Sequence, residues 1–169
     1  MAERRNGSAR VSTWVALAGV TAAAVSAACG GSNNLSKSDF IKQADAICKS
    51  ATDQVDKIPK PSSDNPTPAE LTGILQQSFS IIDGTVQKLD DLKGDKSIEA
   101  ALDDNLIKPT KAQSASAHSL LSELQAAGSD QAKQEAALGK LSNLDDPQQD
   151  QHDKALADAG FNDCSKTNQ

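Results

Sequence analysis

The chain has 169 residues and a net charge of −6 at neutral pH, and 2% of its residues are aromatic. Residues 1–28 hold three basic side chains and one acidic side chain, so the rest of the chain carries 14 basic and 22 acidic residues. This acidic balance, without a stripe of Lys and Arg interleaved with aromatics, argues against nucleic-acid binding and against adhesion to anionic lipid headgroups.

Residues 1–28 have the order of a secretory signal peptide. Arg4, Arg5 and Arg10 precede an apolar run from Val11 to Val25, which ends in small residues. The run has about fifteen residues, whereas a helix that spans the hydrocarbon core needs roughly twenty. Cleavage of this segment as a signal peptide is therefore favoured over a permanent membrane span. The arginine pair leaves twin-arginine export open beside the favoured general secretion.

Cys29 follows this segment within Ser26-Ala27-Ala28-Cys29-Gly30, which resembles the lipobox of bacterial lipoproteins. The usual pattern has Leu three residues before the cysteine, and Ser26 stands there instead, so cleavage without lipidation stays open. A diacylglyceryl group on the Cys29 sulfur would hold the protein in the lipid bilayer, because two acyl chains bury enough methylene groups for stable anchoring. We therefore expect lipidation of Cys29 and attachment to the extracytoplasmic face of the cytoplasmic membrane.

Residues 29–37 are expected to form the lipidated cysteine and a flexible tether, and residues 38–169 a single helical domain. Apolar residues recur every three to four positions from Phe40 to Ile58, which predicts a helix that begins near Ser38. A proline-rich linker follows. Thr67-Pro68-Ala69-Glu70 then predicts a capping box at the start of a second helix, which reaches Leu92 and ends with Gly94 as a left-handed cap.

A third helix is expected to begin at a cap on Asp95 or Ser97 and to run to about Ala127, with Pro109 bending or splitting it. Residues 130–144 again show helical spacing, and a last short helix is expected to end at Ala159, before Gly160. No stretch alternates with the period of a strand. The sequence thus predicts an all-α, four-helix-bundle-like domain whose third helix is kinked at a proline.

The two cysteines that remain beside Cys29 form an even pair in an oxidising compartment, so we expect a Cys48–Cys164 disulfide. Two buried free thiols are the alternative. Redox catalysis normally uses a close C-x-x-C pair, which these residues do not form, and metal binding by two isolated thiols is less favoured still.

The two histidines, His118 and His152, belong to no H-x-x-x-H or H-E-x-x-H motif and are expected to be solvated surface residues. Distance in sequence leaves a Ser/His/Asp site open, although the chain has no G-x-S-x-G elbow. Four acidic residues near the last helix lack the spacing of a calcium loop, so a solvated surface is favoured over a cation site: Asp145, Asp146, Asp150 and Asp153. We expect no metal and no cofactor.

The ends of the domain resemble small exported actinobacterial helical lipoproteins, many of which are uncharacterised. The segment from Asp39 to Cys48 matches a D-F-x-x-x-A-D-x-I-C start, and Gly160 to Cys164 matches a G-F-x-x-C end. The resemblance covers about a tenth of the chain. It implies a helical fold with paired cysteines, and it implies no enzymatic activity.

The absence of a catalytic constellation predicts a membrane-anchored, non-catalytic module that binds an envelope protein or a small molecule. Two alternatives stay open. One is an envelope enzyme that uses scattered carboxylates and a histidine, and the other is a structural spacer without a ligand.

Overall fold

The computed structural model describes residues 34–62, 66–144 and 146–166. Over these ranges the chain forms six α-helices, one π-helical segment and one 3-10 turn, with no β-strand. The predicted all-α class is therefore confirmed. Residues 1–28, for which a signal peptide is expected, and Cys29 lie outside the described residues. The elements in chain order are α1 (Lys37–Val55), α2 (Pro68–Asp90), α3 (Lys96–Leu102), the π-helical segment η1 (Asp103–Ile107), α4 (Lys108–Ala126), α5 (Gln131–Leu141), α6 (Gln149–Ala159) and the 3-10 turn η2 (Cys164–Lys166).

Side-chain caps fix the starts of α1 and α2. The Ser36 hydroxyl accepts a hydrogen bond from the Asp39 amide at 3.2 Å at the start of α1. The Thr67 hydroxyl accepts one from the Glu70 amide at 3.3 Å at the start of α2, which confirms half of the predicted capping box. The Glu70 carboxylate accepts a hydrogen bond from the Ser62 amide at 2.6 Å instead of returning to Thr67, so it fastens the linker to α2.

The glycine expected to close the second helix has a different role. α2 already ends at Asp90, and Gly94 is absent from the described glycines with positive φ. Gly94 is buried against the ring of Phe40, and a Cβ at this position would lie 2.6 Å from Phe40 Cδ2. Close packing therefore requires this glycine. By contrast, the predicted end of the last helix at Ala159 is confirmed, and Gly160 closes α6 as a left-handed cap with φ 105°.

The expected third helix is divided into three consecutive pieces. Asp95 caps α3 through its carboxylate, which accepts a hydrogen bond from the Ser97 amide at 2.9 Å, so Asp95 is the cap and Ser97 is not. After α3, the hydrogen bonding is π-helical across η1, and Pro109 is the second residue of α4. Proline has no N–H to donate, so Pro109 interrupts the hydrogen-bond ladder directly after the π-helical segment.

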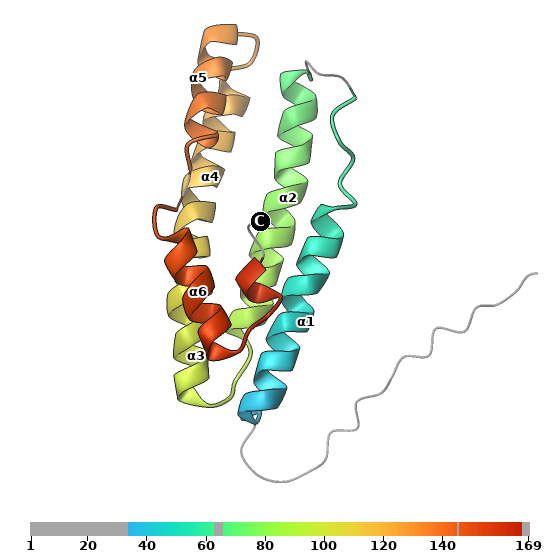
Figure 1. Cartoon of the computed structure of the whole chain (residues 1–169). Helices are drawn as coiled ribbons and strands as arrows, with labels where there is room; N and C mark the ends of the chain where they lie inside the picture. The colour runs from blue at the N-terminus through green and yellow to red at the C-terminus, as the bar shows by residue number, and fades with distance from the viewer. Residues whose placement is uncertain (1–33, 63–65, 145, 167–169) are drawn as a thin grey trace, which may run out of the picture. The chain divides into compact units, whose positions relative to one another are not determined.

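Helix α2 packs against α1 on one side and α4 on the other, and α5 returns along α4. The chain then descends through α6, which lies beside α3 and η1, and η2 contacts α1 (Figure 1). Within the described part, no helix is both long and apolar enough to cross a membrane.

The main core lies where α1, α3, η1 and α6 meet. Phe40 and Phe161 pack edge to face there, with ring centroids 6.4 Å apart, and both are almost fully buried. Leu35 is partly buried against this core and its amide donates a hydrogen bond to the Lys93 carbonyl at 2.8 Å. The last residues of the expected tether are thus part of the domain. The fully or largely buried core residues are Phe40, Ala44, Cys48, Val86, Leu89, Ile98, Leu102, Leu106, Ile107, Leu156, Phe161 and Cys164.

Candidate functional site

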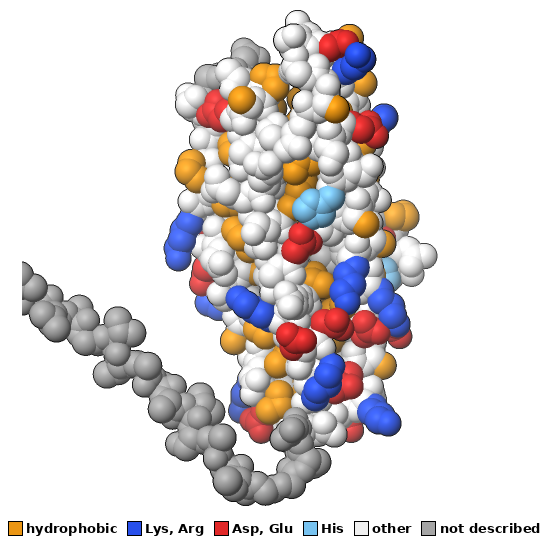
Figure 2. All heavy atoms as spheres, turned by 180° about the vertical axis from the view of Figure 1, so that it is seen from behind, with side chains coloured by type: hydrophobic (Ala, Val, Ile, Leu, Met, Phe, Trp, Pro, Cys, Tyr) orange, Lys and Arg blue, Asp and Glu red, His pale blue; other side chains and the backbone are white. Residues whose placement is uncertain are grey.

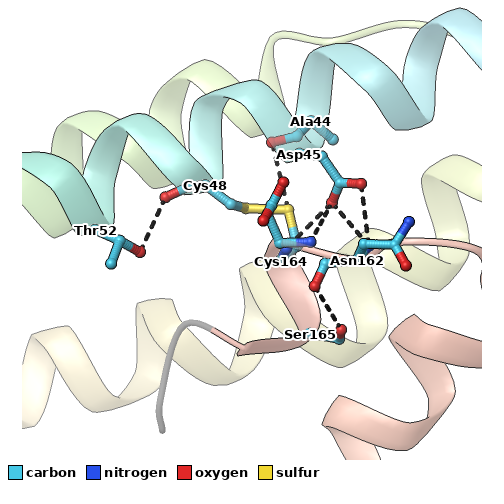
Figure 3. The surroundings of a disulfide bond; sticks show 8 residues. Ala44, Asp45, Cys48, Thr52, Asn162, Cys164 and Ser165 are labelled. Atoms are coloured by element: carbon cyan, nitrogen blue, oxygen red, sulfur yellow. Dashed lines mark hydrogen bonds between the residues drawn. A yellow bond between two sulfur atoms is a disulfide. The ribbon is translucent and has the colours of Figure 1, made fainter.

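A disulfide joins the first helix to the C-terminal segment. The sulfur atoms of Cys48 and Cys164 are bonded, the two Cα atoms are 5.1 Å apart, and both residues are fully buried. The predicted pair is confirmed. Figure 3 shows the bond crossing from α1 to the segment around η2.

The carboxylate of Asp45 holds the same segment by hydrogen bonds. It accepts from the backbone amides of Asn162, Asp163 and Cys164 at 3.0 to 3.1 Å (Figure 3). Three successive amides that converge on one carboxylate fix the path of the backbone just before and at the disulfide. Sequence reasoning missed this role, and its one signal is that Asp45 precedes Cys48 by three positions, which places both on the same face of a helix.

A cavity of about 540 Å³ lies between α1, α2, α4 and the end of α5. Its walls are mainly apolar, and Cys48 forms part of them, so the cavity begins next to the disulfide. Representative wall residues are Ala51 and Val55 from α1, Phe79 from α2, Ala117 from α4 and Leu141 from α5. The volume is within the range of small-molecule sites, about 300 to 1,000 Å³.

The polar side chains of this cavity are largely occupied by the protein itself. The hydroxyls of Thr52 and Thr85 donate hydrogen bonds to carbonyls of their own helices at 3.3 and 2.7 Å. The Gln113 amide donates to the Leu144 carbonyl at 3.5 Å. Across the described residues, no buried side-chain nitrogen or oxygen lacks a hydrogen-bond partner. The cavity therefore offers contact area more than hydrogen-bonding capacity.

A polar cluster borders the cavity across α2 and α4. Asp83 accepts hydrogen bonds from the Ser114 hydroxyl at 2.5 Å and from His118 Nε2 at 2.7 Å. Burial alone would raise the pKa of Asp83, but the hydrogen bonds from Ser114 and His118 and the charge of His118 together lower it. The ring of His118 also lies against Phe79, with ring centroids 5.4 Å apart.

The order of groups in this cluster bears on the Ser/His/Asp possibility. A relay of that kind needs the imidazole between the hydroxyl and the carboxylate, so that it can remove the hydroxyl proton. Here the carboxylate of Asp83 lies between Ser114 and His118. His118 is about half exposed, as expected of a surface histidine, with 49% of its side chain accessible.

The expectation for His152 is wrong, because its side chain is 18% exposed. Its Nδ1 lies 3.2 Å from Asn105 Oδ1 in η1, and its Nε2 lies 3.5 Å from an Asp146 oxygen. The imidazole therefore fills the junction between α6 and η1. Sequence reasoning missed this because the flanking residues are polar and the contact to Asn105 crosses 47 positions.

The acidic residues near α6 are used in local contacts. Asp146 accepts a hydrogen bond from the Gln148 amide, and Asp153 accepts one from the Gln149 side chain. Asp145 lies outside the described residues. Among those that the structure describes, no group of three or more potential metal ligands is present. On the face in Figure 2, acidic and basic side chains are interspersed, with hydrophobic ones between them.

Comparisons with protein-family models, with curated proteins and with solved structures find no match to this chain.

Proposed function

We propose that this protein is an exported lipoprotein, anchored through a diacylglyceryl group on Cys29, whose domain binds a small apolar molecule without chemically changing it. The signal-like residues 1–28 and the lipobox-like cysteine support the export and the anchor. The disulfide is consistent with them, because such bonds persist in oxidising compartments outside the cytoplasm.

The observation that carries the binding role is the cavity of about 540 Å³ between α1, α2, α4 and α5. Burial of apolar surface contributes about 25 cal/mol per Å², so a molecule that filled this space would bind through contact area. The arrangement at Asp83 supports a non-catalytic role, because the imidazole of His118 does not contact the Ser114 hydroxyl. The partner of that hydroxyl is the Asp83 carboxylate, whose lowered pKa makes it a weak base.

A variant that fills the cavity tests this proposal. Ala51→Leu extends a side chain into the space from α1, and Ala46→Leu is its matched control because Ala46 is exposed on the same helix and does not line the cavity. The probe is the neutral dye N-phenyl-1-naphthylamine, whose fluorescence rises in apolar surroundings.

We expect saturable binding by the wild type, unchanged binding by Ala46→Leu, and at least a roughly fivefold weaker affinity for Ala51→Leu, because the added side chain takes up volume that the dye needs. Circular dichroism checks that both variants fold. Equal affinities of wild type and Ala51→Leu, or no saturable binding at all, would overturn the binding role, and the latter is what a structural spacer would show.

The anchor is tested separately by mass spectrometry of the mature protein. We expect the N-terminal residue to be Cys29 with added lipid mass, and a Cys29→Ser form to stay as precursor or to be released. A mature N-terminus without lipid mass would remove the anchor from the proposal and leave export intact.

We also propose a finer description of the fold, in which the helices pack as a four-helix bundle that bends at Pro109. The packing of α2 between α1 and α4 supports the bundle, as does the packing of α5 against α4 and of α6 against α3 and η1. The π-helical segment before Pro109 supports the bend, because π-bulges and prolines are the usual sites of helix kinks.

A further inference from the structure

We infer that the cavity takes an amphipathic cation, an apolar chain with a positively charged end, and that the charge is placed at Asp56. This inference rests on the proposed function, because it specifies the ligand class of the same cavity.

The charge on the cavity wall is negative only. Of the described residues in its wall, Asp56 is the one charged side chain, and none is Lys, Arg or His. Within the described residues, the carboxylate of Asp56 forms no ion pair and no side-chain hydrogen bond. It is exposed, so it stands at the opening and not in the apolar interior. A carboxylate without a protein partner is available to a cation and repels an anion.

The end of α1 adds to this preference. Asp56 is the C-terminal cap of α1, and the last turn of α1 contains no basic residue. The carbonyl end of a helix carries a partial negative charge, which favours cations within about one turn. Lys57 follows in sequence but is exposed and does not line the cavity. The C-terminal end of α1 and the Asp56 carboxylate thus both attract a cation.

An apolar surface lies directly beside this charge. Val55 is the large hydrophobic side chain most open to solvent in the described part of the chain, with 41% exposed, and it lines the cavity next to Asp56. The wall continues inward from there through Ala51 to Cys48. A ligand with a cationic end at Asp56 would cover Val55 with the first part of its chain and place the rest in the cavity.

Competition for N-phenyl-1-naphthylamine tests this inference with the full mature protein. The competitors are decyltrimethylammonium, decanol and decanoate, which share one chain length and differ in the charge of their end. Each is used below the concentration at which it forms aggregates. Asp56→Asn removes the charge. Asp53→Asn is the matched control, because Asp53 lies on the same helix, pairs with Lys49 at 3.4 Å and does not line the cavity.

We expect decyltrimethylammonium to compete roughly fivefold better than decanoate at low salt, since an exposed charge pair contributes up to about 1 kcal/mol. Asp56→Asn should remove most of this difference, and Asp53→Asn should leave it. Added salt should reduce it as well, because exposed charges are screened.

The outcomes separate the two proposals. If the dye and all three competitors bind but with equal strength, or if the two variants lose the difference equally, the cation preference is overturned while the binding role stands. If decanoate competes best, the charge assignment is likewise wrong. If the dye does not bind at all, the binding role fails and the inference fails with it.

Discussion

Loss of the Cys48–Cys164 disulfide is expected to destabilise the domain by about 5 kcal/mol. The two cysteines are 116 positions apart. In the polymer-entropy relation, a loop of this length removes about 16 cal/mol/K of entropy from the unfolded chain, which is about 5 kcal/mol at room temperature. Such domains have free energies of unfolding of only about 5 to 15 kcal/mol, so this single bond contributes a large share of the total stability.

The assay is thermal unfolding followed by circular dichroism, with and without a phosphine reductant, on the wild type and on a double variant, Cys48→Ala with Cys164→Ala. The domain has about 135 residues, for which 5 kcal/mol corresponds to a fall in Tm of roughly 10 to 20 °C. The hydrogen bonds from three amides to Asp45 do not involve the sulfur atoms, so we expect them to hold the C-terminal segment in place after reduction until the main transition begins. A reduced protein that shows two additional titratable thiols but loses less than about 1 kcal/mol would refute this reasoning.

Two further predictions concern packing and pH. Gly94→Ala should destabilise the domain by about 1 to 3 kcal/mol, because the new Cβ would meet the buried ring of Phe40. Gly84→Ala in α2 should instead stabilise it by about 0.5 to 1 kcal/mol, because nothing beyond the local helix backbone and the neighbouring residues lies within 4 Å of the added Cβ. Urea midpoints that shift equally for both variants would contradict the role of close packing. The lowered pKa of Asp83 means that its contribution to stability is present above its unfolded pKa of about 3.9 and is lost as the pH falls through the lower folded value. The gap between wild type and Asp83→Asn, on the order of 0.5 kcal/mol for a half-exposed group, should therefore shrink as the pH falls below about 4 in urea titrations. A gap that widens over this acidic range would reverse the assignment.

The sequence was most informative where local rules decide the structure. The apolar period placed all of the long helices, and the caps at Thr67, Asp95 and Gly160 lie where capping chemistry predicts them. The disulfide followed from the parity of the cysteines, the expected compartment, and the place of Cys48 on the apolar face of the first helix and of Cys164 after the last one. In each case the structure is decided by a short segment of sequence or by the number and place of the cysteines.

The features that escaped prediction depend on distant partners. Gly94 was predicted to be a helix cap, but a glycine is required there because the ring of Phe40 in α1 leaves no room for a Cβ. His152 has polar neighbours in sequence and is nevertheless packed against η1, and Asp45 binds amides more than 115 positions away. The cavity is likewise formed by four helices that converge, and no single helix contains the pattern of its wall.

The disulfide also decides what a protease can release from the protein. All of α2 to α6, together with the proline-rich linker after α1, lies between Cys48 and Cys164, so these residues form a covalent ring. A single cut in the exposed linker near Pro59 would open the ring and still leave both fragments joined as one molecule. A piece of the fold could be separated only by a cut outside the ring, before Cys48 or after Cys164, or by a second cut within it. A nicked molecule would therefore keep its mass until it was reduced.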